Sequence, residues 1–138
     1  MPVREQATSQ KVQLAMQAAI SSDTTTVGGI IDTADLDAGL YFAMSAPVYT
    51  DGTYTMKIED GDNSSLTDAA DVATTQLVYG TLPALSAITA DLDVMPKEGV
   101  HSTKRYVRIS IVSTSVTTGA TINVVAIGGV EVLPSSQT

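Results

Sequence analysis

Residues 59–71 have the residue types and the spacing of a calcium-binding loop. Counted from Asp60, oxygen-bearing side chains stand at positions 1, 3, 5, 9 and 12, which are ligand positions of an EF-hand loop. These side chains belong to Asp60, Asp62, Ser64, Asp68 and Asp71. Position 6 is Ser65 rather than the glycine of the sharp turn, and position 12 is Asp rather than the longer Glu. We therefore expect a solvated loop between strands, with calcium binding as the alternative.

The sequence contains few residues that are candidates for catalysis. His101 is the single histidine, so a Ser-His-Asp triad or a histidine metal site would have to use it. There is no G-x-S-x-G elbow and no H-E-x-x-H motif. The absence of cysteine excludes thiolate zinc sites, iron–sulfur clusters and thiol nucleophiles. We expect a protein that is not an enzyme and uses no cofactor.

The charges are unevenly placed along the 138 residues. Seven basic and 15 acidic residues give a net charge of −8, which argues against binding to nucleic acids or anionic membranes. Residues 97–108 hold four of the seven basic residues, whereas residues 21–95 hold Lys57 as their single basic residue. Two interpretations stay open: ion pairs between loops, or electrostatic complementarity with a protein partner. The candidate partner-contact residues are Arg4, Lys11, Lys97, His101, Lys104, Arg105 and Arg108.

The elements that position these residues are predicted to be strands. The chain contains 19 Thr and 13 Ser but only six aromatic residues, and β-branched residues favour pleated strands. Residues 104–113 alternate, with Val107, Ile109 and Ile111 on one face. This pattern places Arg108 outward, whereas Arg105 shares the apolar face at the strand's edge, where it snorkels or pairs with a carboxylate.

Further strands follow from the same periodicity. Residues 11–20 alternate strictly, and the apolar face is predicted to hold Val12, Leu14, Met16, Ala18 and Ile20. The other predicted strands are residues 24–31, with a bulge at Gly28 and Gly29, and residues 40–46, 53–59, 72–79, 121–127 and 130–133. The segment PKEGVHSTKR at 96–105 is predicted to be an exposed loop that enters the strand at Lys104. Short strands separated by turns predict an all-β fold, a single-domain β-sandwich or jelly roll.

The domain organisation is expected to be simple. Residues 1–10 are predicted to be a flexible N-terminal arm, residues 11–134 the β-sandwich domain, and residues 135–138 a loose tail. The first ten residues lack the apolar run of a signal peptide. Residues 109–130 are uncharged, but they are rich in Ser, Thr, Asn and Gly, so we expect two strands rather than a membrane span. We expect the protein to be made in the cytoplasm.

Three segments carry a resemblance to a known class of proteins. They are DGTYTMKIEDGDNSS at 51–65, KRYVRISIV at 104–112 and TINVVAIGGVEVLP at 121–134, and they follow an apolar strand and a polar arm. In this order they resemble the cement, or decoration, proteins of tailed-bacteriophage capsids. The resemblance implies a jelly roll on the outside of the virion that bridges neighbouring major capsid protein subunits. It also implies a homodimer or trimer with no chemistry and no cofactor.

Two alternatives remain beside the decoration role. The first is another phage structural component, such as a tail or head–tail protein. The second is a carbohydrate-recognition β-sandwich, for which Tyr41, Tyr49 and Tyr54 are the candidate stacking residues. We expect the polar arm and residues 97–108 to carry the contacts in the decoration role.

Overall fold

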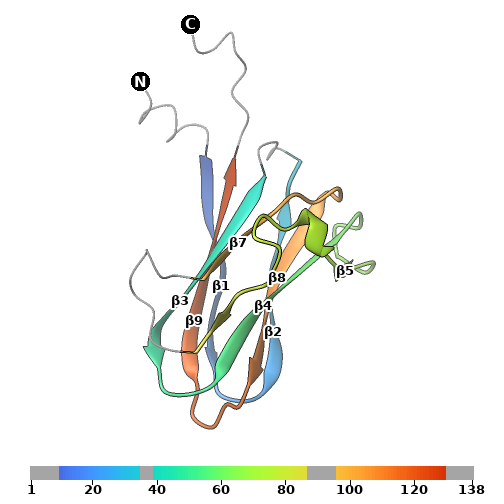
Figure 1. Ribbon diagram of the computed structural model, residues 1–138. Helices are drawn as coiled ribbons and strands as arrows, with labels where there is room; N and C mark the ends of the chain where they lie inside the picture. The colour runs from blue at the N-terminus through green and yellow to red at the C-terminus, as the bar shows by residue number, and fades with distance from the viewer. Residues whose placement is uncertain (1–9, 35–38, 87–95, 130–138) are drawn as a thin grey trace, which may run out of the picture.

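The computed structural model describes residues 10–34, 39–86 and 96–129, and it is built almost entirely of β-strands (Figure 1). In chain order the elements are β1 (Gln10–Ile20), β2 (Thr24–Asp32), β3 (Leu40–Tyr49), β4 (Thr53–Gly61), β5 (Ala70–Asp71), the 3-10 helix η1 (Thr74–Gln76), β6 (Ala84–Leu85), β7 (Lys97–Val100), β8 (Tyr106–Thr114) and β9 (Ala120–Gly129). Among the described residues, no helix is long and apolar enough to cross a membrane.

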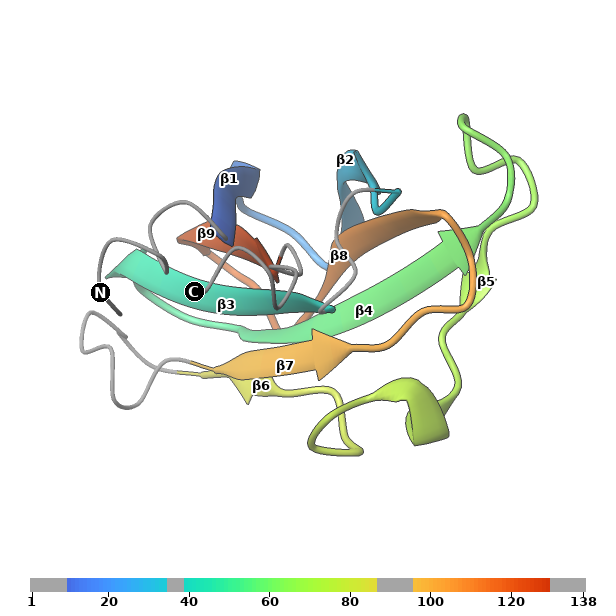
Figure 2. The same cartoon turned by 90° about the horizontal axis from the view of Figure 1, so that it is seen from above.

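Two antiparallel sheets pack against each other. Sheet A has the strand order β1-β9-β3-β7, and sheet B has the order β2-β8-β4-β5, with β6 also paired to β4 (Figures 1 and 2). The pairing is nested, because β1 pairs with β9, β2 with β8, β3 with β7, and β4 with β5 and β6. A chain that pairs first with last and alternates between two sheets is a jelly roll. The all-β sandwich predicted from the sequence is confirmed.

The core lies between the sheets and is built mainly from aliphatic and Met side chains, together with the aromatic rings of Phe42 and Tyr54. Val107, Ile109 and Ile111 of β8 are fully buried, which confirms the alternation predicted for that strand. Each such side chain contributes about 1.5–3 kcal/mol on burial. Fully buried partners come from both sheets: Phe42, Met44, Met56, Ile58, Ile122 and Val124.

The predicted apolar face of the first strand is wrong at Leu14, and the side chain of Val12 is not among those described. A bulge between Leu14 and Met16 places Ala15 and Met16 side by side in the core. The extra residue reverses the alternation, so Leu14 points outward and is 58% exposed. Met16 and Ile20 are buried as predicted.

The bulge predicted at Gly28 and Gly29 is confirmed. The register of β2 against β8 shifts between Val27 and Ile30. Val27 and Ile30 are exposed, whereas Ile31 is buried. β1 and β2 are therefore two bulged edge strands on one side of the sandwich (Figure 2).

Several predicted boundaries need correction. Residues 72–79 form η1 and loop rather than a strand, because their backbone makes the turn bonds Gln76 N to Ala73 O and Leu77 N to Thr74 O. Residues 97–100 are not a loop but strand β7, which pairs with β3. β1 begins at Gln10, the last residue of the predicted arm, and β8 begins at Tyr106 rather than at Lys104. The rest of the predicted arm, the predicted strand at 130–133 and the tail lie outside the described residues.

Candidate interaction surface

The structure separates the seven candidate contact residues. Arg4 lies outside the described residues, and Lys11 lies in β1, where only its backbone is described. Lys97 is exposed at the start of β7. The others lie around the β7–β8 connection and the start of β8: His101, Lys104, Arg105 and Arg108.

Arg105 pairs with a carboxylate, one of the two outcomes expected for it. Its Nε and Nη2 each lie 2.9 Å from a carboxylate oxygen of Asp32, in a bidentate pair. The hydrogen bond from Arg105 lowers the pKa of Asp32 to about 2, and the backbone N–H of Ala34 adds to the effect. The pair ties the end of β2 to the loop before β8.

Lys104 joins the acidic loop, residues 59–71, to the same region. Its Nζ lies 3.0 Å from Asp62 Oδ2, and this contact raises the pKa of Lys104. Asp68 accepts hydrogen bonds from the backbone N–H groups of Asp62 and Asn63, which lower the pKa of Asp68. The acidic loop is thus held by its own carboxylate and by one lysine.

Arg108 lies on the outer face of sheet B, as predicted, but it is not open to solvent. Its Nη2 lies 3.0 Å from Glu59 Oε1, and the two side chains are only 20% and 14% exposed. Glu59 is the cross-strand partner of Arg108 in the register of β4 with β8. The ion-pair interpretation therefore accounts for Lys104, Arg105 and Arg108, and a role of these residues in partner binding stays a prediction.

The calcium-loop spacing is not matched by a ligand cluster. Asp60 accepts a hydrogen bond from Ser102 Oγ at 2.5 Å, Asp62 pairs with Lys104, and Asp71 faces Lys57 at 3.9 Å. Each of these carboxylates therefore contacts a different side chain, and they do not converge on one point. Across residues 10–34, 39–86 and 96–129, no three acidic or histidine side chains gather as a metal site would require.

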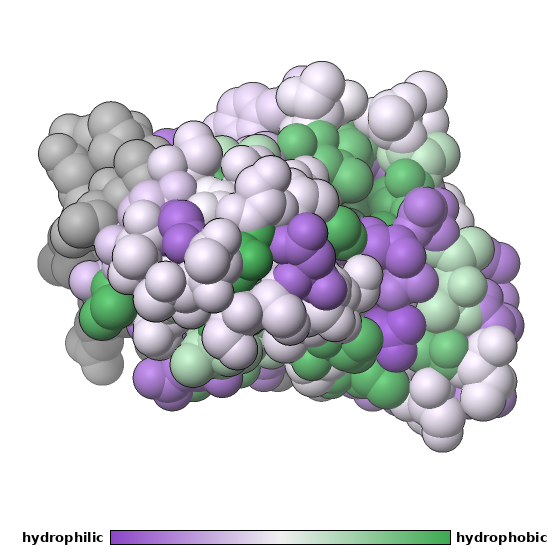
Figure 3. Space-filling view, turned by 90° about the horizontal axis from the view of Figure 1, so that it is seen from below, coloured by the Kyte–Doolittle hydropathy of each residue, from purple (hydrophilic) through white to green (hydrophobic). Residues whose placement is uncertain are grey.

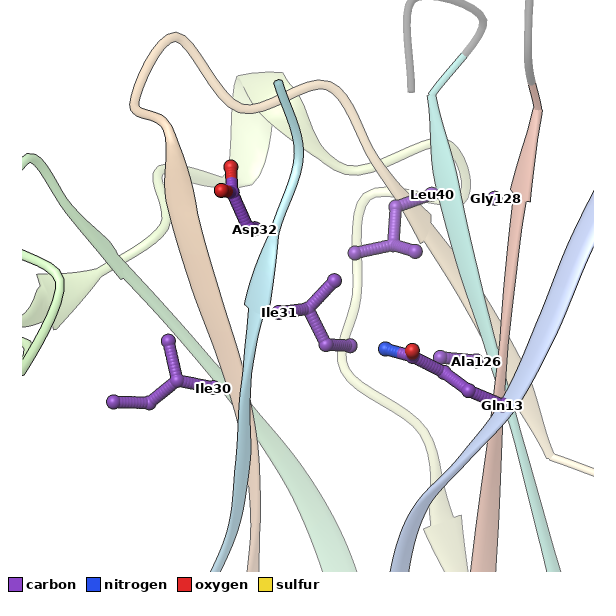
Figure 4. A pocket seen from close by; sticks show the side chains of 7 residues that line it. All are labelled: Gln13, Ile30, Ile31, Asp32, Leu40, Ala126 and Gly128. Atoms are coloured by element: carbon purple, nitrogen blue, oxygen red, sulfur yellow. The ribbon is translucent and has the colours of Figure 1, made fainter. Parts of the chain in front are cut away.

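Two clefts open between the sheets at the end where β2 finishes and β3 begins. The first, about 220 Å³, is lined by Gln13, Ile31, Leu40 and their neighbours, and Figure 4 shows Ile31 pointing toward Gln13 while Ile30 points away. The second, about 260 Å³, is bordered by His101 and also by Leu40. Both clefts are small and mainly flank core side chains, so neither resembles a ligand site of the usual size.

The opposite end of the sandwich carries the tight turns. The Asp51 carboxylate accepts hydrogen bonds from the backbone N–H groups of Thr117, Thr118 and Gly119, and these bonds lower the pKa of Asp51. This contact fastens the β3–β4 turn to the β8–β9 turn. Figure 3 shows this end as mostly pale, with small hydrophilic and hydrophobic groups, in keeping with its Ser, Thr and Gly residues.

The outer face of sheet A is a surface that the sequence interpretation missed. In the register of the sheet, Leu14 lies opposite Val125 and Val125 opposite Ala43, so one apolar row crosses three strands. The next row brings Ile127 beside Tyr41, which is 42% exposed. Gly99 of β7 lies opposite Tyr41, and a Cβ atom placed on Gly99 would lie 2.6 Å from both Tyr41 Cε1 and Val78 Cγ2. Val78 therefore lies beside Tyr41 and extends this row beyond β3. We call these side chains the sheet A face: Leu14, Tyr41, Ala43, Val78, Val125 and Ile127.

A signal for this face is present in the sequence. Residues 121–127 have apolar side chains at both odd and even positions near their end, as Val124, Val125, Ala126 and Ile127 show. A strand with one solvated face alternates, whereas a strand covered on both faces does not. The run therefore indicates a second apolar surface beside the core.

The tyrosines proposed for sugar stacking are not arranged as a platform. Tyr54 is fully buried, and its hydroxyl donates to Asp51 O. Tyr49 is half-buried against Tyr54, with ring centroids 6.3 Å apart, and its hydroxyl donates to Gly52 O. Of the three, only Tyr41 is exposed, so the basis of the carbohydrate alternative is wrong for two of its residues.

Comparison with known proteins gives little further information. No protein-family model matches the chain, and no curated protein matches it. Among solved structures, the chain is similar to SPBc2 prophage-derived protein YomS, with a TM-score of 0.44 and 11% sequence identity over 86% of this chain and 93% of that chain. A likeness of this size does not indicate what the chain does.

Proposed function

We propose that the chain is a virion structural protein that binds the outside of a tailed-phage capsid and stabilises it by bridging neighbouring major capsid protein subunits. The observation that carries the proposal is the sheet A face, an apolar surface on the outside of the jelly roll in which Leu14, Tyr41 and Val78 are exposed. Exposed apolar patches of this kind mark protein–protein contacts. The proposed role is binding, without catalysis and without a cofactor.

The electrostatics support a structural role. In the described residues, the carboxylates of Asp32, Asp51, Glu59, Asp62 and Asp68 are engaged in ion pairs or with backbone N–H groups. Side chains fixed in this way hold loops in place. An active site instead tends to gather titratable groups whose pKa values are shifted toward the working pH.

Residues 97–108 remain the proposed contact with the capsid. Lys104 and Arg105 keep 47% and 55% of their side-chain surface exposed although each has an acidic partner. Exposed pairs exchange partners at small cost, because surface ion pairs are weak. A capsid subunit with acidic groups at its surface can therefore compete for these cations.

Particles with and without the protein provide the experiment. We expect capsids of the phage that encodes the chain to withstand higher temperature, or longer exposure to a chelator, when the protein is bound. The variant Lys104→Ala should reduce co-sedimentation with capsids. The variant Lys57→Ala is the matched control, because Lys57 also faces an Asp but lies on the outer face of sheet B, with 36% of its side chain exposed. Particles equally stable with and without the protein would contradict the role, and equal binding by both variants would contradict the proposed contact.

A further inference from the structure

In the described part of the chain, each sheet edge has a feature that hinders strand addition. β1 and β2 are interrupted by bulges, which blunt an edge. The outer edge of β7 is covered by residues 76–78, since Val78 N donates to Gly99 O and His101 N donates to Gln76 O. On β4 the outer edge is partly covered by β5 and β6. A partner therefore meets the faces of the sandwich more readily than its edges.

The two faces differ in charge. The outer face of sheet B carries Lys57, Glu59 and Arg108. The described side chains on the outer face of β1, β9 and β3 are all uncharged, and Lys97 lies at the border of that face, opposite Ala43. The described acidic residues lie on sheet B, in the loops or, for Glu98, in the interior. Among the described residues, the sheet A face thus carries no acidic side chain, and Lys97 stands at its border, in a chain with a net charge of −8.

This distribution favours a second copy of the chain as the occupant of the face. Two copies with a charge of −8 each repel unless their acidic residues point away from each other. Contact through the sheet A face achieves this for the described acidic residues, because it buries apolar surface and leaves those residues outside the contact. A basic partner would instead be drawn to the acidic residues elsewhere.

The polar residues of the face are also self-complementary. Gln17, Asn123 and Ser45 form one row across the three strands. Amides and hydroxyls both donate and accept, so two identical rows can satisfy each other in an isologous contact.

From these relationships we infer that the outer face of sheet A is the contact between two copies of the chain in a homodimer. Strands spaced about 4.8 Å apart and rising about 3.3 Å per residue give a face of about 500 Å² per copy. The buried total of about 1,000 Å² lies at the lower limit for a specific interface. The dimer is therefore expected to be reversible on dilution. This inference assigns the sheet A face to self-association and leaves residues 97–108 as the proposed contact with the capsid.

Sedimentation velocity over a hundredfold dilution series tests the dimer. The variant Leu14→Glu should weaken self-association at least tenfold. The matched control is Val27→Glu, because Leu14 and Val27 are 58% and 55% exposed and both lie beside a bulge of an edge strand. Circular dichroism melting verifies that both variants are folded. Added salt should strengthen the wild-type dimer, since it screens the repulsion between the two negative copies.

A covalent trap gives a second readout. The chain has no cysteine, so the variant Gln17→Cys can form only an intermolecular disulfide, and oxidation should link it into dimers faster than Lys57→Cys. A wild-type protein that stays monomeric throughout the series, or equal weakening by Leu14→Glu and Val27→Glu, would overturn the inference. A monomer that still binds capsids would leave the proposed function standing, and a dimer that does not bind them would leave only the inference.

Discussion

A Cβ atom placed on Gly28 would lie 2.8 Å from the carbonyl oxygen of Ala15, so the two open edge strands meet where there is no room for a side chain. Gly28 belongs to the bulge of β2, and Ala15 is the extra residue of the bulge in β1. The Ile109 carbonyl oxygen would lie 2.7 Å from the same Cβ. The two bulges therefore face each other and narrow the gap between the sheets.

This contact predicts different effects for two adjacent glycines. Gly28→Ala should lower the free energy of unfolding by about 1–3 kcal/mol, because overpacking against backbone atoms forces the strands apart. Gly29→Ala should have little effect on packing, because the nearest atom to its Cβ position is the Ala15 carbonyl oxygen at 4.0 Å. Urea denaturation of both variants measures the difference. Equal stability of the two variants would show that β1 and β2 do not meet at this point.

Glu98 predicts a second stability effect. Its side chain is fully buried, and Oε1 accepts hydrogen bonds from the N–H groups of Tyr79 and Gly99. Glu98→Ala should destabilise the protein by about 2–4 kcal/mol, because it leaves two donors unsatisfied and opens a cavity. Hydrogen exchange at the Tyr79 amide should accelerate. Glu98→Gln keeps an acceptor oxygen and should lose less, and an equal loss in both variants would argue against the hydrogen bonds as the cause.

The ion pairs predict a third stability effect. It distinguishes Arg108, whose pair stabilises the fold, from Lys104, which is proposed to contact a partner. Arg108→Ala should lower the free energy of unfolding by about 1–2 kcal/mol, because Glu59, which is only 14% exposed, then keeps only the longer contact with Lys57 at 3.9 Å. Lys104→Ala should leave the melting temperature nearly unchanged, since the Lys104–Asp62 pair is exposed. Differential scanning calorimetry measures both. A larger loss from Lys104→Ala than from Arg108→Ala would reverse this ranking.

Acid should weaken the fold. Asp32, Asp51 and Asp68 have pKa values below the ordinary value in the folded chain. A lowered pKa means that the stabilisation is complete above about pH 4 and is lost as the pH falls toward about 2. The melting temperature should therefore drop over this window, and the drop should be smaller in Asp51→Asn. A constant melting temperature between these pH values would contradict the role assigned to the carboxylates.

Much of the fold could be predicted from residue patterns. The Val, Ile and Thr alternation of β8 determines which side chains enter the core, and the glycine pair 28–29 marks a bulge. The bulge at Ala15 leaves no such mark, because alanine fits either face of a strand. β7 was missed because Lys97, Glu98 and Gly99 have low strand propensity, and the burial of Glu98 depends on the N–H of Tyr79, 19 residues earlier in the chain.

The candidate surface was harder to predict than the strands. The uneven charge along the sequence could be seen, but the pairing of Arg105 with Asp32 joins residues 73 positions apart and follows from the nested strand order. The sheet A face combines side chains of β1, β3 and β9, and Leu14 belongs to it only because of the bulge. Such surfaces depend on register, which local sequence does not determine.

The copy number of the chain in purified virions tests the proposed role most directly. Quantitative mass spectrometry of virions, with the major capsid protein as the internal reference, measures this number. The decoration role predicts a number of copies comparable to that of the major capsid subunits, removed together with the outer surface by mild dissociation. A handful of copies that fractionate with tails, or complete absence from the virion, would contradict it.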